Sequence, residues 1–181
     1  MKNKERVIVF IDGSNVYHIL RDMFPNKKPN DFDFEKFARY ISKDRISFGV
    51  YYYNVPLDIT YNKEKYLKQQ KFFDKIQRIP NFNFVLCRMQ KQKINGKTIY
   101  LVKEDDIHLA VDMVKLAYNN VYDIAILVSS DGDFVPAINA VQEIDKEVEN
   151  IGFENKFSYH LKQKCNRFII LKSKEVKQFF I

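Results

Sequence analysis

Two short runs of consecutive apolar residues constrain the fold of this 181-residue chain more than any other feature. They cover residues 7–11 and 124–128, and most of their members are β-branched. A run of this length without alternating polar residues is typical of a strand buried on both faces, and such strands belong mostly to parallel sheets. Turn-forming residues and then a helical pattern follow each run. The chain is therefore predicted to contain βαβ units.

The rest of the chain continues this alternation of strands and helices. Asn95-Gly96 is a hairpin turn signal between two β-type segments. The fold class is predicted as α/β, a three-layer α/β/α arrangement with a mostly parallel central sheet, plus a small β-hairpin around Asn95-Gly96. The chain shows neither a repeat nor a linker, so residues 1–181 are predicted to form one domain. Further strands are predicted at residues 46–53, 82–89, 98–102 and 148–151, the last of these being the final core strand.

A helix is predicted over about residues 106–118. Its expected apolar positions are Ile107, Ala110, Val111, Val114 and Leu116.

Several classes of protein are excluded by composition. No apolar run approaches the roughly 18 residues of a membrane span, and the N-terminal run meets Asp12 too soon for a signal peptide. Cys87 and Cys165 lie far apart, which argues against a disulfide scaffold and a zinc finger. The spacing of His18, His108 and His160 matches no known catalytic or metal-binding histidine motif. We expect a cytoplasmic protein without a membrane segment.

Charge is distributed unevenly along the chain, whose net charge is +7. Residues 61–103 carry 11 basic and 2 acidic side chains, whereas residues 104–150 carry 2 basic and 11 acidic ones. This pattern indicates a polyanionic partner for the basic segment and a different role for the acidic one. The alternative is that the lysine-rich helices are only solvated surfaces.

Acidic residues follow both of the buried runs directly. Asp12 ends the first run, and Asp131 and Asp133 follow the second. In open α/β sheets, sites form at the carboxyl ends of strands where the strand order reverses, so neighbouring strands would bring these acids together. Clustered carboxylates repel one another, and oxygen ligands select a hard cation such as Mg²⁺ or Mn²⁺. The alternative is that Asp12 and Asp131 only cap the following helices.

A third acidic element opens the helix after the hairpin. Acids in a first helical turn are favourable for dipole reasons alone, so Asp105 is expected to be a cap, whereas Asp106 could point into the cluster. Asp112 lies about 600° around the helix from Asp106, so the two cannot share a face. Asp112 is therefore expected to support the ligands from outside or to form a salt bridge, and Asp105 is likewise expected to stand outside the ligand set and support it.

Three motifs follow one another along the chain: Asp12-Gly13-Ser14-Asn15, Lys103-x-x-Asp106-Ile107-x-Leu109-Ala110-Val111-Asp112 and Leu127-Val128-Ser129-Ser130-Asp131-Gly132-Asp133-Phe134-x-Pro136. Together they resemble the NYN domain in its LabA-like form, within the PIN-like nuclease superfamily. The resemblance covers about residues 6–171 and continues into Ser158-x-x-Leu161. Glu104 and Asp145 stand where the family usually has glycine, and Asn166 stands where it usually has aspartate.

This resemblance implies a metal-dependent ribonuclease site. Asn15 would orient a carboxylate or a phosphate, and Ser130 and Lys103 are expected to join it in contacting the substrate. The catalytic and metal-binding residues implied are Asp12, Asp106, Asp131 and Asp133, with Mg²⁺ or Mn²⁺ as the cofactor.

The expected function is hydrolysis of RNA, with single-stranded or looped RNA as the favoured substrate. Tyr51, Tyr52 and Tyr53 stand in succession, so at least one ring should point outward, where it could stack on a base. The alternatives are a non-catalytic RNA-binding or regulatory module on the same fold, and a protein–protein scaffold. A homodimer is also possible for a domain of this size.

Overall fold

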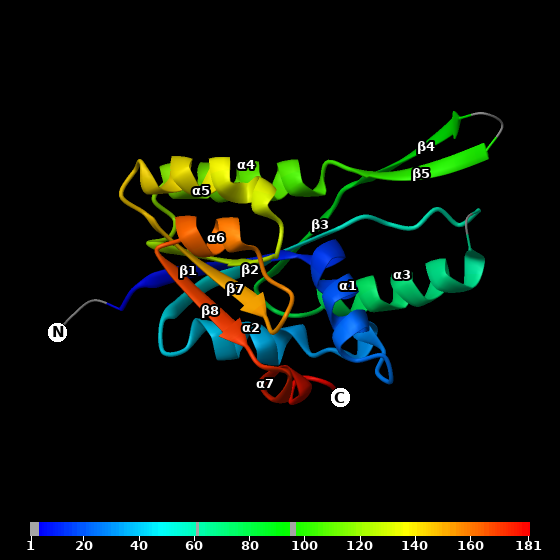
Figure 1. Ribbon diagram of the computed structural model, residues 1–181, viewed down its shortest axis with the longest axis horizontal. Coiled ribbons are helices and arrows are strands. Elements are labelled where there is room, and N and C mark those ends of the chain that lie inside the picture. The colour runs from blue at the N-terminus through cyan, green and yellow to red at the C-terminus, as the bar shows by residue number, and fades with distance from the viewer. Residues whose placement is uncertain (1–3, 61, 95–96) are drawn as a thin grey trace.

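A six-stranded, all-parallel sheet forms the centre of the computed structural model, which describes residues 4–60, 62–94 and 97–181 (Figure 1). The strand order is β3-β2-β1-β6-β7-β8. The predicted α/β fold with a parallel sheet is confirmed. The strands are β1 (Arg6–Asp12), β2 (Ile46–Asn54), β3 (Phe82–Leu86), β6 (Ile124–Val128), β7 (Glu147–Phe153) and β8 (Arg167–Leu171).

Helices cover both faces of the sheet and complete the three predicted layers (Figure 1). The side chains of β1 alternate between two hydrophobic cores, with Val7 and Val9 in one and Ile8 and Phe10 in the other. One face packs against α1 (Gly13–Met23), α2 (Phe34–Ser42), α3 (Lys63–Gln77) and α7 (Ser173–Lys177), and the other against α4 (Asp105–Tyr118), α5 (Val135–Gln142) and α6 (Tyr159–Lys164). Two short 3₁₀ helices are η1 (Pro29–Asp31) and η2 (Gly132–Phe134). None of the described helices combines the length and apolar character needed to cross a bilayer.

The predicted hairpin is confirmed as an antiparallel pair separate from the sheet, β4 (Arg88–Ile94) and β5 (Lys97–Lys103). Its predicted turn, Asn95-Gly96, lies outside the described residues. The strand predicted over residues 82–89 is wrong at its end, because β3 stops at Leu86 and Met89 belongs to β4. Leu86 pairs with Asn54, the last residue of β2, so no partner strand continues beyond it.

The prediction that residues 148–151 form the final core strand is wrong, because β8 follows β7 in the chain and pairs with it. β8 is a five-residue edge strand that begins with Arg167 and leaves Ile170 38% exposed. A strand of this kind lacks the continuous burial that made the central strands recognisable.

Three of the five apolar positions predicted for α4, Ala110, Val114 and Leu116, are partly buried against the core, but the most deeply buried stripe of the helix is a different one. Ile107 and Val111 are 66% and 56% exposed, whereas Leu109, Met113 and Ala117 are buried against the sheet. Both stripes have helical spacing and both are apolar, so periodicity alone does not choose between them. The buried stripe recurs at every fourth residue, and counting back from Leu109 it reaches Asp105.

The three consecutive tyrosines of β2 do not provide an outward ring, which makes that prediction wrong. Tyr52 and Tyr53 are buried. Tyr51 is partly buried and stacks on Phe10, with the ring centroids 5.6 Å apart. Because helices cover both faces of β2, alternate side chains of this strand all point into packed layers.

Candidate metal centre

The strand order reverses between β1 and β6. From β1 the sheet continues outward through β2 to β3, and from β6 it continues in the opposite direction through β7 to β8. Ile11 pairs with Val128, so the two carboxyl ends are neighbours. Ligand sites of open α/β sheets form at this kind of reversal. The strands that carry the acidic turns are therefore adjacent, as the sequence argument required.

Asp12 lies at this reversal and is only 4% exposed. Its Oδ1 accepts a hydrogen bond from the backbone N–H of Asn15 (3.0 Å), which caps α1, and its Oδ2 accepts one from the hydroxyl of Ser129 (2.9 Å). An ideal Cβ on Gly13 would lie 2.5 Å from both the Tyr52 ring and the Tyr53 carbonyl oxygen. Asp12 therefore caps α1, as the alternative interpretation expected. Its side chain is also buried at the carboxyl end of β1, next to a glycine whose backbone packs closely against β2.

Asp105 is not the helix cap that was predicted. The N-cap position of α4 belongs to Glu104, and no side chain caps the helix there. Glu104 adopts the left-handed backbone region with φ of 78°, which explains why the NYN family usually has glycine at this position. Asp105 therefore becomes the first residue of the helix, and its side chain joins the buried stripe at 7% exposure.

Three carboxylates lie close together at the carboxyl end of β1. Oxygen atoms of Asp12, Asp105 and Asp106 all lie within 4.8 Å of one another, the geometry of a possible cation site. Hereafter these three residues are called the acid cluster. The structure brings together Asp12 and Asp106 as the sequence argument proposed, and adds Asp105, which that argument had placed outside.

Asp131 and Asp133 lie at the rim of the acid cluster rather than inside it. Asp131 Oδ1 accepts a hydrogen bond from the Asp133 N–H (2.9 Å) and caps η2. The Asp131 N–H in turn donates to the Ser129 hydroxyl oxygen (3.1 Å). The negative charges of both aspartates contribute to the raised pKa of Asp106, so they are electrostatic neighbours of the cluster.

Burial and mutual repulsion raise the pKa of two of the clustered acids. For Asp12 the value is raised to about 7, mainly by burial and further by the charges of Asp106 and Asp105, against the lowering effect of its hydrogen bonds. The pKa of Asp106 is raised to about 6 by desolvation and then by the charges of Asp105, Asp131 and Asp133. A divalent cation would remove this repulsion, and the three carboxylates of the acid cluster offer it hard oxygen donors.

The residues predicted to support the site have different positions. Asn15 Oδ1 accepts hydrogen bonds from the N–H and the hydroxyl of Ser130, both at 3.1 Å, so these two residues bind each other across the β1–β6 junction. Asp112 accepts a hydrogen bond from the Tyr53 hydroxyl (3.0 Å) and stands outside the acid cluster. Lys103 ends β5, and its side chain lies outside the described part of the structure.

Two polar residues that were not singled out from the sequence, Ser129 and Asn150, form hydrogen bonds that connect the strands at the β1–β6 junction. Ser129 is fully buried, and its hydroxyl donates to Asp12 and accepts from the Asp131 N–H, which links the acids of the two strands. The Asn150 amide donates to the carbonyl oxygens of Leu127 and Ser129, both at 3.0 Å. Ser129 directly follows the apolar strand β6, and Asn150 lies inside the mostly buried strand β7; a polar residue at such a buried position is the sequence signal for this role.

The other departures from the NYN pattern lie away from the acid cluster. Asn166 precedes β8, and its Oδ1 accepts hydrogen bonds from the Val148 N–H and the Gln142 amide, both at 2.8 Å. These contacts lie near the amino end of β7, opposite the acids. Asp145 has φ of 57°, again a conformation that favours glycine.

Comparison with known proteins identifies relatives without an assigned activity. Residues 6–172 match the NYN domain. The chain is 28% identical over 157 residues to the uncharacterized protein MJ0482 of Methanocaldococcus jannaschii, a match that covers 87% of this chain and 51% of that protein. The chain thus spans about half the length of the curated relative it matches. The crystal structure of VPA0982, a protein of unknown function from Vibrio parahaemolyticus, is similar with a TM-score of 0.67 and 19% identity, over 100% of this chain and 99% of that one; this similarity concerns the fold alone.

Proposed function

The chain belongs to the NYN domain family, and from that premise we propose that it is a metal-dependent ribonuclease acting at the acid cluster. One observation carries the proposal. Three carboxylates from β1 and α4 converge at the reversal point of a parallel sheet, with two further acids at the rim. Among the side chains that the structure describes, no lysine or arginine forms an ion pair with Asp12, Asp105 or Asp106, and a divalent cation would offset their repulsion.

The donor set fits Mg²⁺ or Mn²⁺. Asp12, Asp105 and Asp106 offer one carboxylate oxygen each within a space that one ion can bridge. Asp131 and Asp133 add negative charge from the neighbouring strand. A divalent cation bound there would supply Lewis-acid polarisation of a phosphate and a bound water of lowered pKa.

The chain's own residues would then orient the reactants. The Ser129 hydroxyl fixes the Asp12 carboxylate, so its ligand geometry is set before substrate arrives. Because the Asn15 amide oxygen is engaged by Ser130, Asn15 would approach a phosphate oxygen through its amide N–H groups. Asp133, exposed at the rim, is suited to accept a proton from the attacking water at a carboxylate oxygen.

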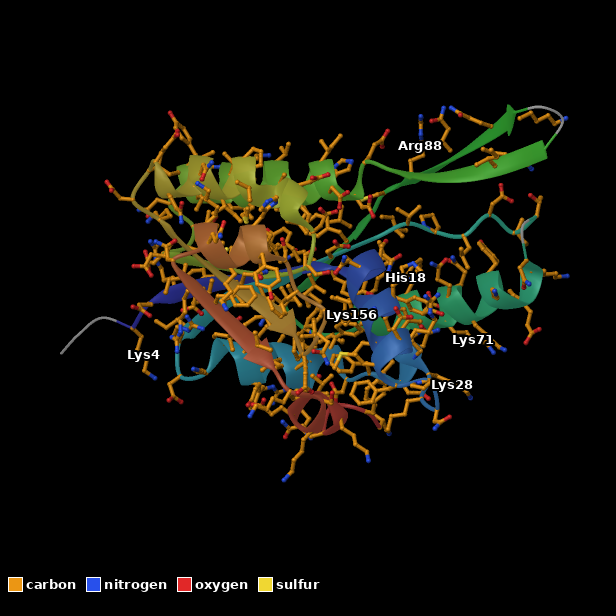
Figure 2. The ribbon with its side chains drawn as sticks, viewed as in Figure 1. Lys4, His18, Lys28, Lys71, Arg88 and Lys156 are labelled. Carbon is orange, nitrogen blue, oxygen red and sulfur yellow. The ribbon has the colours of Figure 1, made fainter. Side chains whose placement is uncertain are left out.

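Two basic projections support RNA as the substrate. The β4–β5 hairpin follows the carboxyl end of β3, and a connecting segment leads outward from the carboxyl end of β2 to α3. Both the hairpin and α3 extend beyond the edge of the sheet that carries the acid cluster (Figure 1). Arg88 on the hairpin and Lys71 on α3 are exposed (Figure 2). Phosphates on either side of the scissile bond would contact these arms, so binding should weaken steeply with salt. The other exposed basic residues of the two elements include Lys63, Lys65, Lys68, Lys75, Lys91 and Lys93.

The experiment compares RNA cleavage by the full chain with and without metal. A labelled single-stranded RNA is incubated with wild-type protein in Mn²⁺, in Mg²⁺ and in EDTA, and with the variants Asp12→Asn, Asp106→Asn and Asp131→Asn. Loss of an essential carboxylate should reduce cleavage by at least about 100-fold. Asp44→Asn is the matched control, because Asp44 is exposed and precedes the amino end of β2, opposite the acid cluster.

Cleavage that requires metal, is lost in the three cluster and rim variants and is retained in Asp44→Asn would support the proposal. RNA binding without cleavage under any of these conditions would instead favour the non-catalytic RNA-binding module. Absence of both binding and cleavage would leave a protein–protein scaffold. Cleavage that persists in EDTA would contradict a metal-dependent mechanism directly.

A further inference from the structure

The amino end of α6 lies against the turn that carries the two rim acids. An ideal Cβ on Gly132 would lie 3.3 Å from His160 Nδ1 and 3.4 Å from Ser158 Oγ. Gly132 stands between Asp131 and Asp133. The start of α6 therefore contacts the turn that carries both rim acids, and residues 157–160 are neighbours of the proposed reaction site.

Tyr159 presents a large aromatic surface at this position. Its side chain is 69% exposed, and its ring centroid lies 5.0 Å from that of Phe157 with 55° between the ring planes. Phe157 in turn packs edge-on against Phe168, at 5.6 Å between centroids. The Tyr159 ring thus rests on a packed aromatic residue, and its remaining surface is open to solvent.

Two lysines lie close to the Phe157–Tyr159 ring pair. Lys162 Nζ lies 5.9 Å from the centroid of the Phe157 ring, and Lys156, which directly precedes Phe157, is exposed. Lys156 lies beside α1, where it pairs with Asp22 at 3.1 Å (Figure 2). A single ring among lysines does not resemble a docking surface for an apolar peptide. It combines the π-face and the positive charge that bind a base and its adjacent phosphates.

We propose that the exposed ring of Tyr159 stacks on a nucleobase of single-stranded RNA next to the acid cluster. This inference rests on the proposed function, because it assigns a base-binding position to the same substrate. A paired base is already stacked within its helix, so the contact selects single-stranded over duplex RNA. The tyrosines of β2, which were expected to supply such a ring, are packed into the fold.

The first test measures affinity for a labelled single-stranded RNA dodecamer and for its duplex by fluorescence anisotropy, in EDTA so that metal-dependent cleavage does not interfere. Tyr159→Ala should weaken single-strand binding about 5- to 150-fold, the effect of losing one stacked base. Tyr159→Phe keeps the ring and should keep the affinity. Tyr118→Ala is the matched control, because Tyr118 is 78% exposed at the far end of α4 from the acid cluster.

The second test uses the absence of tryptophan from the chain. Tyr159→Trp introduces the only tryptophan of the chain, whose emission should be quenched when the single-stranded dodecamer is added. Tyr118→Trp should show no quenching. Since Tyr159 is largely exposed, circular dichroism should find all of these variants folded.

Wild-type affinity in Tyr159→Ala, or equal losses for single-stranded and duplex RNA, would overturn the inference. Equal quenching at both tryptophan positions would also overturn it. Failure of the proposed function has a different signature: wild-type protein would bind the dodecamer and show the Tyr159 effects, yet cleave no RNA in Mn²⁺. Wild-type protein that does not bind RNA at all would overturn both.

Discussion

Replacing Asp12 with asparagine should stabilise the metal-free protein at alkaline pH. The pKa of Asp12 is raised from 3.8 to about 7, so the folded protein holds this proton more tightly than the unfolded chain does. The stability that this proton contributes is fully present below pH 4 and is lost as the pH rises through 7. Asparagine carries no such charge and is an equally good helix cap.

The size of the effect follows from that difference in pKa. A difference of about three units corresponds to about 4 kcal/mol between low pH and pH 8. Rearrangement of the hydrogen bond from Ser129 should offset about 1 kcal/mol of the gain. At pH 8 in EDTA, Asp12→Asn should therefore raise the free energy of unfolding by about 2–4 kcal/mol relative to wild type.

Urea denaturation followed by circular dichroism at several values between pH 4 and pH 8 measures this difference. Because titrating groups outside the acid cluster affect both proteins equally, the result to examine is the gap between the two curves, which should widen as the pH rises. Mn²⁺ should narrow the gap at pH 8 by stabilising wild type alone, by about 2.7 kcal/mol at 100 times its dissociation constant. Parallel curves across the pH range, or a gap of the same size in the control Asp44→Asn, would refute the reasoning.

Three further substitutions test other parts of the structure. Gly13→Ala places a Cβ 2.5 Å from the Tyr53 carbonyl oxygen and should cost about 1–3 kcal/mol in urea denaturation; an unchanged midpoint would contradict this close approach. Asp123→Asn removes hydrogen bonds from the backbone and guanidinium of Arg6, which hold the pKa of Asp123 below its usual range. It should cost about 1 kcal/mol after solvent screening, with the loss disappearing as acid protonates the wild-type carboxyl; a loss that persists in acid would exclude the ion pair as its cause. Glu104→Gly relieves a left-handed φ of 78° and should raise unfolding free energy by about 0.5 kcal/mol; a clear destabilisation would show that its side chain stabilises α4.

Much of the sheet was predictable because its central strands are buried on both faces. Residues 7–11 and 124–128 are β1 and β6 almost to the residue, and the acids that follow them meet at one edge. The amphipathic helices and the edge strand were less predictable. In α4 two apolar stripes compete, and only packing against the sheet decides that Asp105 faces inward.

The same limit applies to the residues around the acid cluster. Asp106 was found from the sequence because a motif names it, whereas Asp105 was interpreted as a cap from the general preference for acids in a first turn. The left-handed residue Glu104 places the cap one position earlier. Tyr159 could not be singled out from sequence, because its importance depends on the contact between α6 and Gly132.

The reversal of strand order also has a consequence during synthesis of the protein. The hydrogen bond from Ser129 to Asp12 joins residues 117 positions apart, and Asp105 and Asp106 also come from far beyond β1. Closing so long a loop is slow compared with the formation of local helices. A nascent chain on the ribosome therefore carries Asp12 without its partners until β6 has emerged and docked. Any RNA-cleaving activity would stay latent beside the message being translated, because neither half of the chain holds the complete set of acids.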